Sequence, residues 1–147
     1  MKCGWYTSLG CMVMLLQAMV APCDAAPTTW HVATNGLDSN LGTDWSQAFL
    51  TISNAVAYAA DGDTVLVSNG TYGVDTQIAV NEGIVIRGVN GATNTIVCRT
   101  AGVTRIFYLT HASSVLDGVT ISNGYTAVDF GGGVYLMAGT VSNCVIA

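Results

Sequence analysis

Positive charge is scarce in this sequence. The 147 residues include 4 Lys and Arg against 9 Asp and Glu, which gives a formal net charge of -5. None of the three arginines, Arg87, Arg99 and Arg105, adjoins another. Phosphate backbones and anionic lipid surfaces both bind clustered cations, so we expect no nucleic acid and no anionic membrane surface as a partner.

Long hydrophobic runs are missing as well. Residues 11–20 (CMVMLLQAMV) form an apolar stretch, but a bilayer span needs roughly 20 such residues. A short positive start precedes this stretch, and Ala25 follows it as the small residue that signal peptidase requires. We therefore predict a signal peptide at residues 1–25, rather than a buried N-terminal helix, and no transmembrane segment in the mature chain. Lipidation at Cys23 is disfavoured because Pro22 precedes that cysteine.

Cysteine is also scarce in the predicted mature chain, where only Cys98 and Cys144 remain. Export permits a disulfide between them. The repeat described below separates them by two turns, which at about 4.8 Å per turn puts their Cα atoms roughly 10 Å apart, beyond bridging distance. We expect two buried thiols that pack as small apolar side chains.

Glycine is abundant by contrast, with 17 residues, and β-branched residues recur in a fixed order. Residues 114–121 (SVLDGVTI) are echoed by residues 140–147 (TVSNCVIA) at an offset of 26, which equates Asp117 with Asn143. A unit of this length cannot bury its own apolar face. The repeat therefore predicts a solenoid in which successive turns stack.

Short apolar runs continue this pattern from residue 64 onward. Asn-Gly pairs between the runs predict sharp corners, because left-handed backbone costs little there. A sandwich built from hairpins is the alternative, but it requires longer strands and two-residue connections. The pairs are Asn69-Gly70, Asn90-Gly91 and Asn123-Gly124. We predict two interleaved columns of strands, at residues 64–67, 84–86 and 106–109 and at residues 77–80, 95–98, 119–121 and 144–146.

The region before these runs predicts a cap. Residues 30–33 (WHVA) indicate a first strand, and residues 34–44 form a polar loop. Residues 45–60 carry a helical pattern, because apolar positions recur there at the spacing of one helix face. These positions are Ile52, Ala55, Val56 and Ala59. We expect the helix to cover the open end of the first turn.

The predicted organisation is a signal peptide, a cap at residues 26–63 and the first turns of a solenoid at residues 64–147. The sequence stops at Ala147 in mid-strand, directly after a copy of the repeat. We expect a fragment whose C-terminal turns are missing, or an edge that pairs with another copy.

Two segments resemble known proteins. Residues 30–72 are similar to the N-terminal cap and first turn of bacterial secreted proteins of the pectin-lyase-like superfamily, through T-I-x-x-A-V, G-D-T-V and N-G-T-Y. Residues 131–135 (GGGVY) and the following GTVSNCVI resemble the Gly-Gly repeats of polymorphic outer-membrane and autotransporter-like proteins, without their Phe-x-x-Asn half. The resemblance implies an all-β fold, a right-handed parallel β-helix with a short N-terminal capping helix. It also implies a protein that is secreted, extracellular or associated with the outer membrane.

Relatives on this fold include polysaccharide lyases and hydrolases, so we consider which residues of this chain could supply a base or paired carboxyl groups. A lyase needs a cationic base beside calcium-binding acids, and Arg87 and Arg99 are the plausible bases, yet no acid cluster accompanies either in sequence. A hydrolase needs two carboxyl groups across the sugar. Asp61 and Asp63 flank Gly62 at a helix-to-strand corner, where we favour turn capping.

Other constellations have structural interpretations as well. Asp38-Ser39-Asn40 suggests calcium, but Asx turns that satisfy their own backbone are favoured. His31 and His111 lie far apart, and Ser113-Ser114 has no acid partner within sequence reach for a nucleophilic triad. Four tyrosines either form an outward strip on which sugars stack or pack in the core, and we favour packing. They are Tyr72, Tyr108, Tyr125 and Tyr135.

We assign no catalytic, cofactor-binding or metal-binding residue from the sequence. The leading hypothesis is a non-catalytic, exported β-helix segment that presents a repetitive face for binding or adhesion to a polysaccharide or a cell-surface ligand. The alternative is the N-terminal part of a pectate-lyase-like enzyme or polysaccharide hydrolase whose catalytic turns lie beyond Ala147. Fold resemblance cannot decide between them, because one fold supports many functions.

Overall fold

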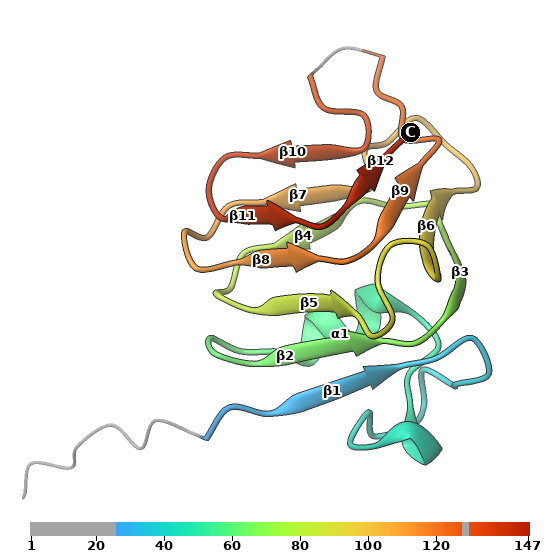
Figure 1. Cartoon of the computed structure of the whole chain (residues 1–147), viewed down its shortest axis with the longest axis vertical. Coiled ribbons are helices and arrows are strands. Elements are labelled where there is room, and N and C mark those ends of the chain that lie inside the picture. Colours follow the sequence, from blue (N-terminus) through green and yellow to red (C-terminus); the bar gives the residue numbers. More distant parts are fainter. Residues whose placement is uncertain (1–25, 128–129) are drawn as a thin grey trace, which may run out of the picture.

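The computed structural model describes residues 26–127 and 130–147, so the predicted signal peptide at residues 1–25 lies outside the described residues. Short strands wind into a β-solenoid of about three turns (Figure 1). Every strand pairing in the described chain is parallel. The predicted solenoid is therefore confirmed, and a sandwich built from antiparallel hairpins is excluded.

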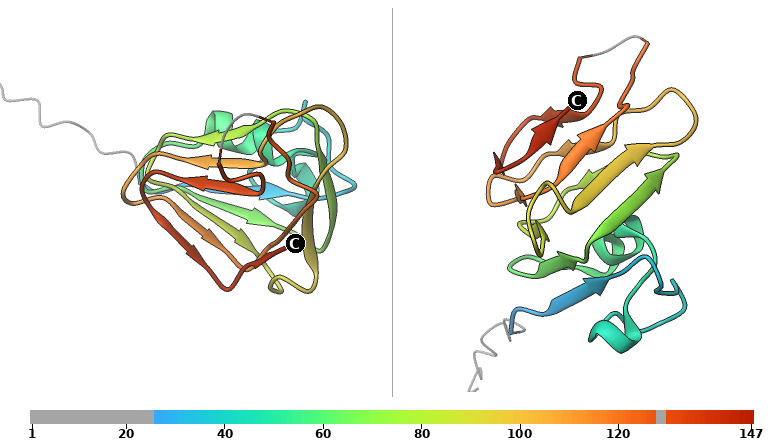
Figure 2. Two further views of the ribbon diagram at one scale, coloured as in Figure 1. Left: turned by 90° about the horizontal axis from the view of Figure 1, so that it is seen from above. Right: turned by 45° about the vertical axis from the view of Figure 1, so that its right-hand side comes forward.

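Three columns of strands surround the interior, as the view along the long axis shows (Figure 2, left). Sheet A contains β1 (Thr29–Val32), β2 (Thr64–Val67), β5 (Val85–Gly88), β8 (Val115–Asp117) and β11 (Thr140–Ser142). Sheet B contains β3 (Gly70–Val74), β6 (Thr95–Arg99), β9 (Thr120–Ser122) and β12 (Val145–Ile146). Sheet C contains β4 (Ile78–Val80), β7 (Phe107–Leu109) and β10 (Val134–Leu136).

The prediction of two columns was wrong. Strand β3 (GTYGV) escaped recognition because its outward positions are Thr71 and Gly73 and only Tyr72 and Val74 face the core. The third column, sheet C, also takes one strand from each of the two predicted columns. Strand β7 was grouped with β2 and β5, but it pairs with β4 in sheet C.

The register between the last two turns also differs from the prediction. Strand pairing aligns Leu116 with Val141 and Ile121 with Ile146, an offset of 25 rather than 26. Asp117 therefore lies opposite Ser142 and not opposite Asn143. A shift of one residue would turn every side chain to the opposite face of the sheet, so the apolar interior fixes the register.

The interior is a stack of aliphatic and aromatic side chains. In sheet A, the inward file includes Val65, Ile86 and Leu116, which are at most 1% exposed. In sheet B, Val97 and Ile121 continue the same arrangement with 0% exposed. Burial of each such side chain contributes about 1.5–3 kcal/mol before the entropy cost of folding. The fold is thus stabilised by contacts between turns.

The predicted helix at residues 45–60 is two shorter helices. Asp44 caps the N-terminus of the 3-10 helix η1 (Trp45–Gln47), and Thr51 caps that of α1 (Ile52–Tyr58), where its hydroxyl accepts from Asn54 N at 3.2 Å. Helix α1 lies against β4, β1 and β2 and buries Ile52 and Ala55, and the residue that caps its C-terminus, Ala59, is buried as well. It covers the N-terminal end of the interior, as the apolar stripe predicted.

The edge of β1 has a separate cover. His31 N donates to Gly42 O at 2.8 Å, and Ala33 N donates to Phe49 O at 2.9 Å. The segment at residues 42–49 therefore pairs with β1 on the side away from β2. Within the described residues, no helix is both long enough and apolar enough to cross a bilayer.

Both described cysteines are free and half-buried. Cys98 lies opposite Ser122 of the next turn, and Cys144 lies just before β12 in the turn after that, so the predicted two-turn separation is confirmed. Their expected burial is only partial. Cys144 packs against the core, and burial raises the pKa of its thiol, whereas Cys98 alternates with the buried Val97 and faces outward.

Candidate functional site

Two tyrosines lie next to each other on the outer face of sheet C. Register places Tyr135 of β10 directly opposite Tyr108 of β7, and their ring centroids are 5.5 Å apart at an interplanar angle of 36°. Phe107 and Leu109 on either side of Tyr108 are 0% exposed, because alternate residues of a strand face opposite sides. The core-facing neighbours thus hold the tyrosine rings outside.

Arg105 and Met137 complete this group. The Arg105 guanidinium lies 4.6 Å from the centroid of the Tyr135 ring and 5.6 Å from that of Tyr108, within the range of cation–π attraction. The Tyr108 hydroxyl donates to Met137 Sδ at 2.7 Å. We call Arg105, Tyr108, Tyr135 and Met137 the sheet C cluster. It offers an aromatic and cationic surface held by two successive turns.

The other two predicted tyrosines lie elsewhere. Tyr72 is 5% exposed, and its hydroxyl donates to Ser68 O at 3.0 Å. Burial raises the pKa of this phenol. Tyr125 is exposed beside Arg99, whose guanidinium lies 5.7 Å from its ring centroid. The packing that we favoured therefore holds for Tyr72 only, and of the four tyrosines only Tyr108 and Tyr135 form an outward pair.

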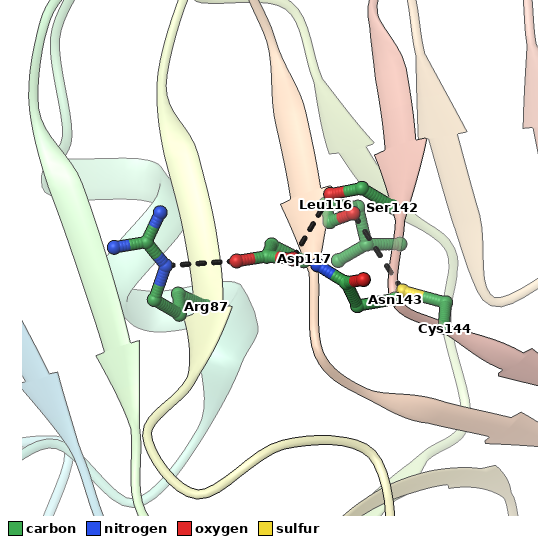
Figure 3. A network of polar contacts seen from close by, with 6 residues as sticks. All are labelled: Arg87, Leu116, Asp117, Ser142, Asn143 and Cys144. Carbon is green, nitrogen blue, oxygen red and sulfur yellow. Dashed lines mark hydrogen bonds and ion pairs between the residues drawn. The ribbon is translucent and has the colours of Figure 1, made fainter.

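Arg87 has an acid partner that the sequence did not reveal. Its Nε atom donates to Asp117 Oδ2 at 2.9 Å, and the two side chains come from neighbouring strands of sheet A (Figure 3). Thirty residues separate them, so only the stacking of turns brings them together. The Arg87 side chain is 53% exposed and that of Asp117 is 17% exposed.

Asp117 is a junction between three turns. Its Oδ1 atom accepts from the Asn143 amide at 2.8 Å and from the Ser142 hydroxyl at 2.9 Å (Figure 3). These two hydrogen bonds, with that from Arg87, lower the pKa of the Asp117 carboxyl. The carboxylate therefore holds the corner of the last turn in place, and the residue aligned with it is Ser142 rather than Asn143.

Arg99 and the histidines also contact their immediate surroundings. Arg99 Nε donates to Asn123 O at 2.7 Å, and Nη1 donates to Gly102 O. His31 makes an edge contact with the Trp45 ring at 4.6 Å between centroids.

The hydrogen bonds between His111 and the two serines that follow it each involve a backbone atom, whereas a catalytic triad needs a serine hydroxyl bonded to an imidazole nitrogen. His111 Nδ1 accepts from the backbone N–H of Ser113 at 3.2 Å, and the Ser114 hydroxyl donates to the His111 carbonyl at 2.8 Å. Neither serine hydroxyl bonds to an imidazole nitrogen in the part of the chain that the structure describes.

Asp61 and Asp63 bond to the backbone. Asp61 Oδ1 accepts from Gly83 N at 2.6 Å. Asp63 is 6% exposed and accepts from Thr28 N at 2.7 Å, Trp30 Nε1 at 2.8 Å and Ala60 N at 3.0 Å. Burial would raise the pKa of Asp63, but the three hydrogen bonds outweigh it, and the pKa lies below its ordinary value. The pair therefore links the cap to the first turn.

Asp38 also has a structural role, but not the local turn that we expected. Its Oδ1 atom accepts from Leu50 N at 3.0 Å and Thr51 N at 2.9 Å, so the carboxylate joins the loop to the segment before α1. Asn40 Nδ2 likewise donates to Ala48 O at 2.9 Å. Within residues 26–127 and 130–147, no group of three or more His, Cys, Asp or Glu side chains has the arrangement of a metal site.

Comparisons with models of protein families, with curated proteins and with solved structures find no match to this chain. The parallel solenoid is the fold that the resemblance implied. A relation to pectin-lyase-like or autotransporter-like proteins rests on the resemblance alone.

The role of Arg105 in the sheet C cluster was not predicted from the sequence. Arg105 and Tyr108 are three residues apart, but Tyr135 is 27 residues further on. The offset of 25 residues between the last turns of sheets A and B would have aligned Tyr108 with Gly133. The pairing of Tyr108 with Tyr135 therefore required the register of sheet C itself, where the offset is 27.

Proposed function

We propose that this chain is a non-catalytic β-solenoid segment of an exported surface or extracellular protein, and that its outer faces bind a polysaccharide. The observation that supports this proposal is the sheet C cluster, in which Tyr108 and Tyr135 lie next to each other in register on the outside of two successive turns. Aromatic rings provide apolar faces for the C–H groups of sugars, and Arg105 adds a cationic hydrogen-bond donor. The resemblance to autotransporter-like and pectin-lyase-like proteins supports the proposed location.

The hydrogen bonds of the carboxylates favour a structural role over a catalytic one. Glycosidic hydrolysis needs two carboxyl groups directed at one bond of the substrate. Asp61 and Asp63 instead accept hydrogen bonds from backbone N–H groups, and Asp117 is joined to Arg87 and the last turn. Each of these groups stabilises a corner of the solenoid.

The binding test uses affinity electrophoresis of the full chain in gels that contain polygalacturonate, xylan or soluble chitosan. We expect retardation by at least one polymer, and we expect the double variant Tyr108→Ala with Tyr135→Ala to weaken it about tenfold or more, because both stacking faces are lost. Tyr125→Ala is the matched control, since Tyr125 is an exposed tyrosine outside the sheet C cluster. Equal retardation of the double variant and the wild type would refute this site.

The second candidate function is the N-terminal part of a carbohydrate-active enzyme whose catalytic residues lie outside this chain, and the resemblance to pectin-lyase-like proteins favours it. Incubation of the full chain with polygalacturonate and calcium tests the two candidates. We expect no rise in the absorbance of unsaturated product. A calcium-dependent rise would establish lyase activity and overturn the non-catalytic proposal.

A further inference from the structure

The N-terminal edge of sheet B lacks the cover that β1 has. Gly70 N donates to Asn94 O at 2.8 Å, and Val74 O accepts from Thr100 N at 2.9 Å, so these residues direct their backbone toward β6. Strand alternation directs the N–H and C=O groups of Thr71 and Gly73 to the other side. In the described chain, no hydrogen bond reaches those four groups.

In sheet C, the backbone N–H and C=O groups of Ala79 also point away from the neighbouring strand. Ile78 N donates to Ile106 O at 2.8 Å, and Val80 O accepts from Thr110 N at 3.0 Å. Both residues therefore face β7, and the backbone of Ala79 faces away from it. Helix α1 lies near this edge, but no hydrogen bond from the described residues reaches Ala79. An open strand edge is a template on which another extended chain can pair.

A groove runs along these two edges. It consists of two adjoining hollows of about 410 and 290 Å³, which share Ser53 and Ile78 as lining residues. One lies along β3 and continues past its end to Thr76, and the other lies along β4 and continues past its end to Glu82. Helix α1 forms the opposite wall. Apolar side chains contribute to the lining, namely Ile52, Val56, Val74 and Ile78.

The charge of the groove is acidic. Asp75 and Glu82 are its charged lining residues, both are exposed, and no lysine or arginine lines it. A second copy of this chain suits the groove poorly, because its net charge is -5 and Arg87 is already paired with Asp117. Charge complementarity therefore favours a basic partner.

We propose that this groove binds an extended, basic segment of a partner polypeptide, which adds a strand to the edge of β3. The N–H and C=O groups of Thr71 and Gly73 supply main-chain hydrogen bonds at the spacing of alternate residues in a strand. Apolar side chains of the segment contact Val74 and Ile78, and its cations lie near Asp75 and Glu82. This site is separate from the sheet C cluster, so either proposal can fail without the other.

The test begins with a blocked ten-residue peptide that alternates valine and lysine, labelled with fluorescein. Its binding to the full chain is followed by fluorescence anisotropy at low salt. The control is the same peptide with methylated backbone nitrogens, which keeps every charge but cannot donate to β3. We expect the control to bind at least about tenfold more weakly, because several hydrogen bonds are lost. We also expect slower hydrogen exchange at the Thr71 and Gly73 amides when the unmethylated peptide is bound.

Variants of the chain sharpen this test. The double variant Asp75→Asn with Glu82→Gln should weaken binding about three- to tenfold at low salt and less at high salt. The double variant Asp44→Asn with Asp61→Asn is the matched control, because it removes the same number of charges at exposed residues outside the groove and should leave binding unchanged. Equal binding of both peptides would mean adsorption by charge alone and would overturn the proposal. No binding of the unmethylated peptide, or unchanged amide exchange, would overturn it as well.

Discussion

Ile121 and Ile146 occupy the same position in successive turns, yet their environments differ. Strand pairing aligns them in sheet B, where Ile121 is 0% exposed and Ile146 is 59% exposed. Ile121 lies between Val97 of the turn before and Ile146 of the turn after. No described strand stacks on the other side of Ile146. In a solenoid, the same residue type is therefore core or surface according to the turns on either side of it.

The largest expected effect tests this comparison directly. Ile121→Ala should lower the free energy of unfolding by about 2–5 kcal/mol, because it opens a cavity between two turns. Ile146→Ala should cost less than about 1 kcal/mol, because much of that side chain is already in water. Urea unfolding of the full chain, followed by circular dichroism, measures both losses. Similar losses for the two variants would show that Ile146 is buried in solution.

The sequence was sufficient to predict which side chains point inward in most turns. Val65 and Ile86 belong to apolar runs, so their burial could be predicted from local pattern alone. Strand β3 could not, because a strand with Thr71 and Gly73 on its outer face carries a weak local signal. Without β3, the number of columns was underestimated. The predicted offset of 26 came from aligning similar residue types in the two copies of the repeat. The true offset of 25 is determined by the stacking of Ile121 on Ile146.

Candidate sites were harder to predict than the fold. The pair of Arg87 with Asp117 and that of Tyr108 with Tyr135 each join residues 27 to 30 positions apart. Their contacts depend on the lengths of the corners as well as on the strands. A sequence pattern can predict that such residues face outward, but only the stacking of turns determines which of them meet.

The second prediction compares Asp63, a carboxylate at the covered end, with Asp117, a carboxylate that bonds to the last turn. Both carboxylate oxygens of Asp63 accept hydrogen bonds from N–H donors. Asp63→Asn replaces one of these oxygens by an NH₂ group, which then faces an N–H donor and cannot accept from it. We expect a loss of about 2–3 kcal/mol in the free energy of unfolding. Asp117→Asn should cost about 0.5–1 kcal/mol, because its ion pair with Arg87 is partly exposed. The same urea unfolding measures both, and a larger loss at Asp117 would reverse the comparison.

The effect of Asp63 should also depend on pH. Its pKa is lowered in the folded state from an ordinary value of 3.8, so its stabilising contribution is complete above pH 4 to 5. The contribution is lost as the pH falls from about 4 through the lowered pKa. The difference in unfolding free energy between the wild type and Asp63→Asn should therefore be constant from pH 5 to 7 and shrink below about pH 4. A difference that grows on acidification would contradict this assignment.

The smallest expected effect concerns the corner residues Gly118 and Asn143, which both have left-handed backbone with φ of 66° and 50°. They occupy the same corner in successive turns, each following an aligned residue of β8 and β11. A Cβ atom at position 118 would lie 3.3 Å from Gly88 O, whereas Asn143 is exposed. Gly118→Asn should therefore cost about 1–2 kcal/mol, because close packing adds to backbone strain.

The exchange in the opposite direction completes the comparison. Asn143→Gly removes one hydrogen bond to Asp117 but keeps a residue that tolerates positive φ, so we expect a change within about 0.5–1 kcal/mol. Shifts of the urea midpoint for the two variants, measured side by side, give the difference. If Gly118→Asn is as well tolerated as Asn143→Gly, then the corner between β8 and β9 accommodates a Cβ atom despite its closeness to Gly88 O, and neighbouring turns constrain the corners less than they constrain the core.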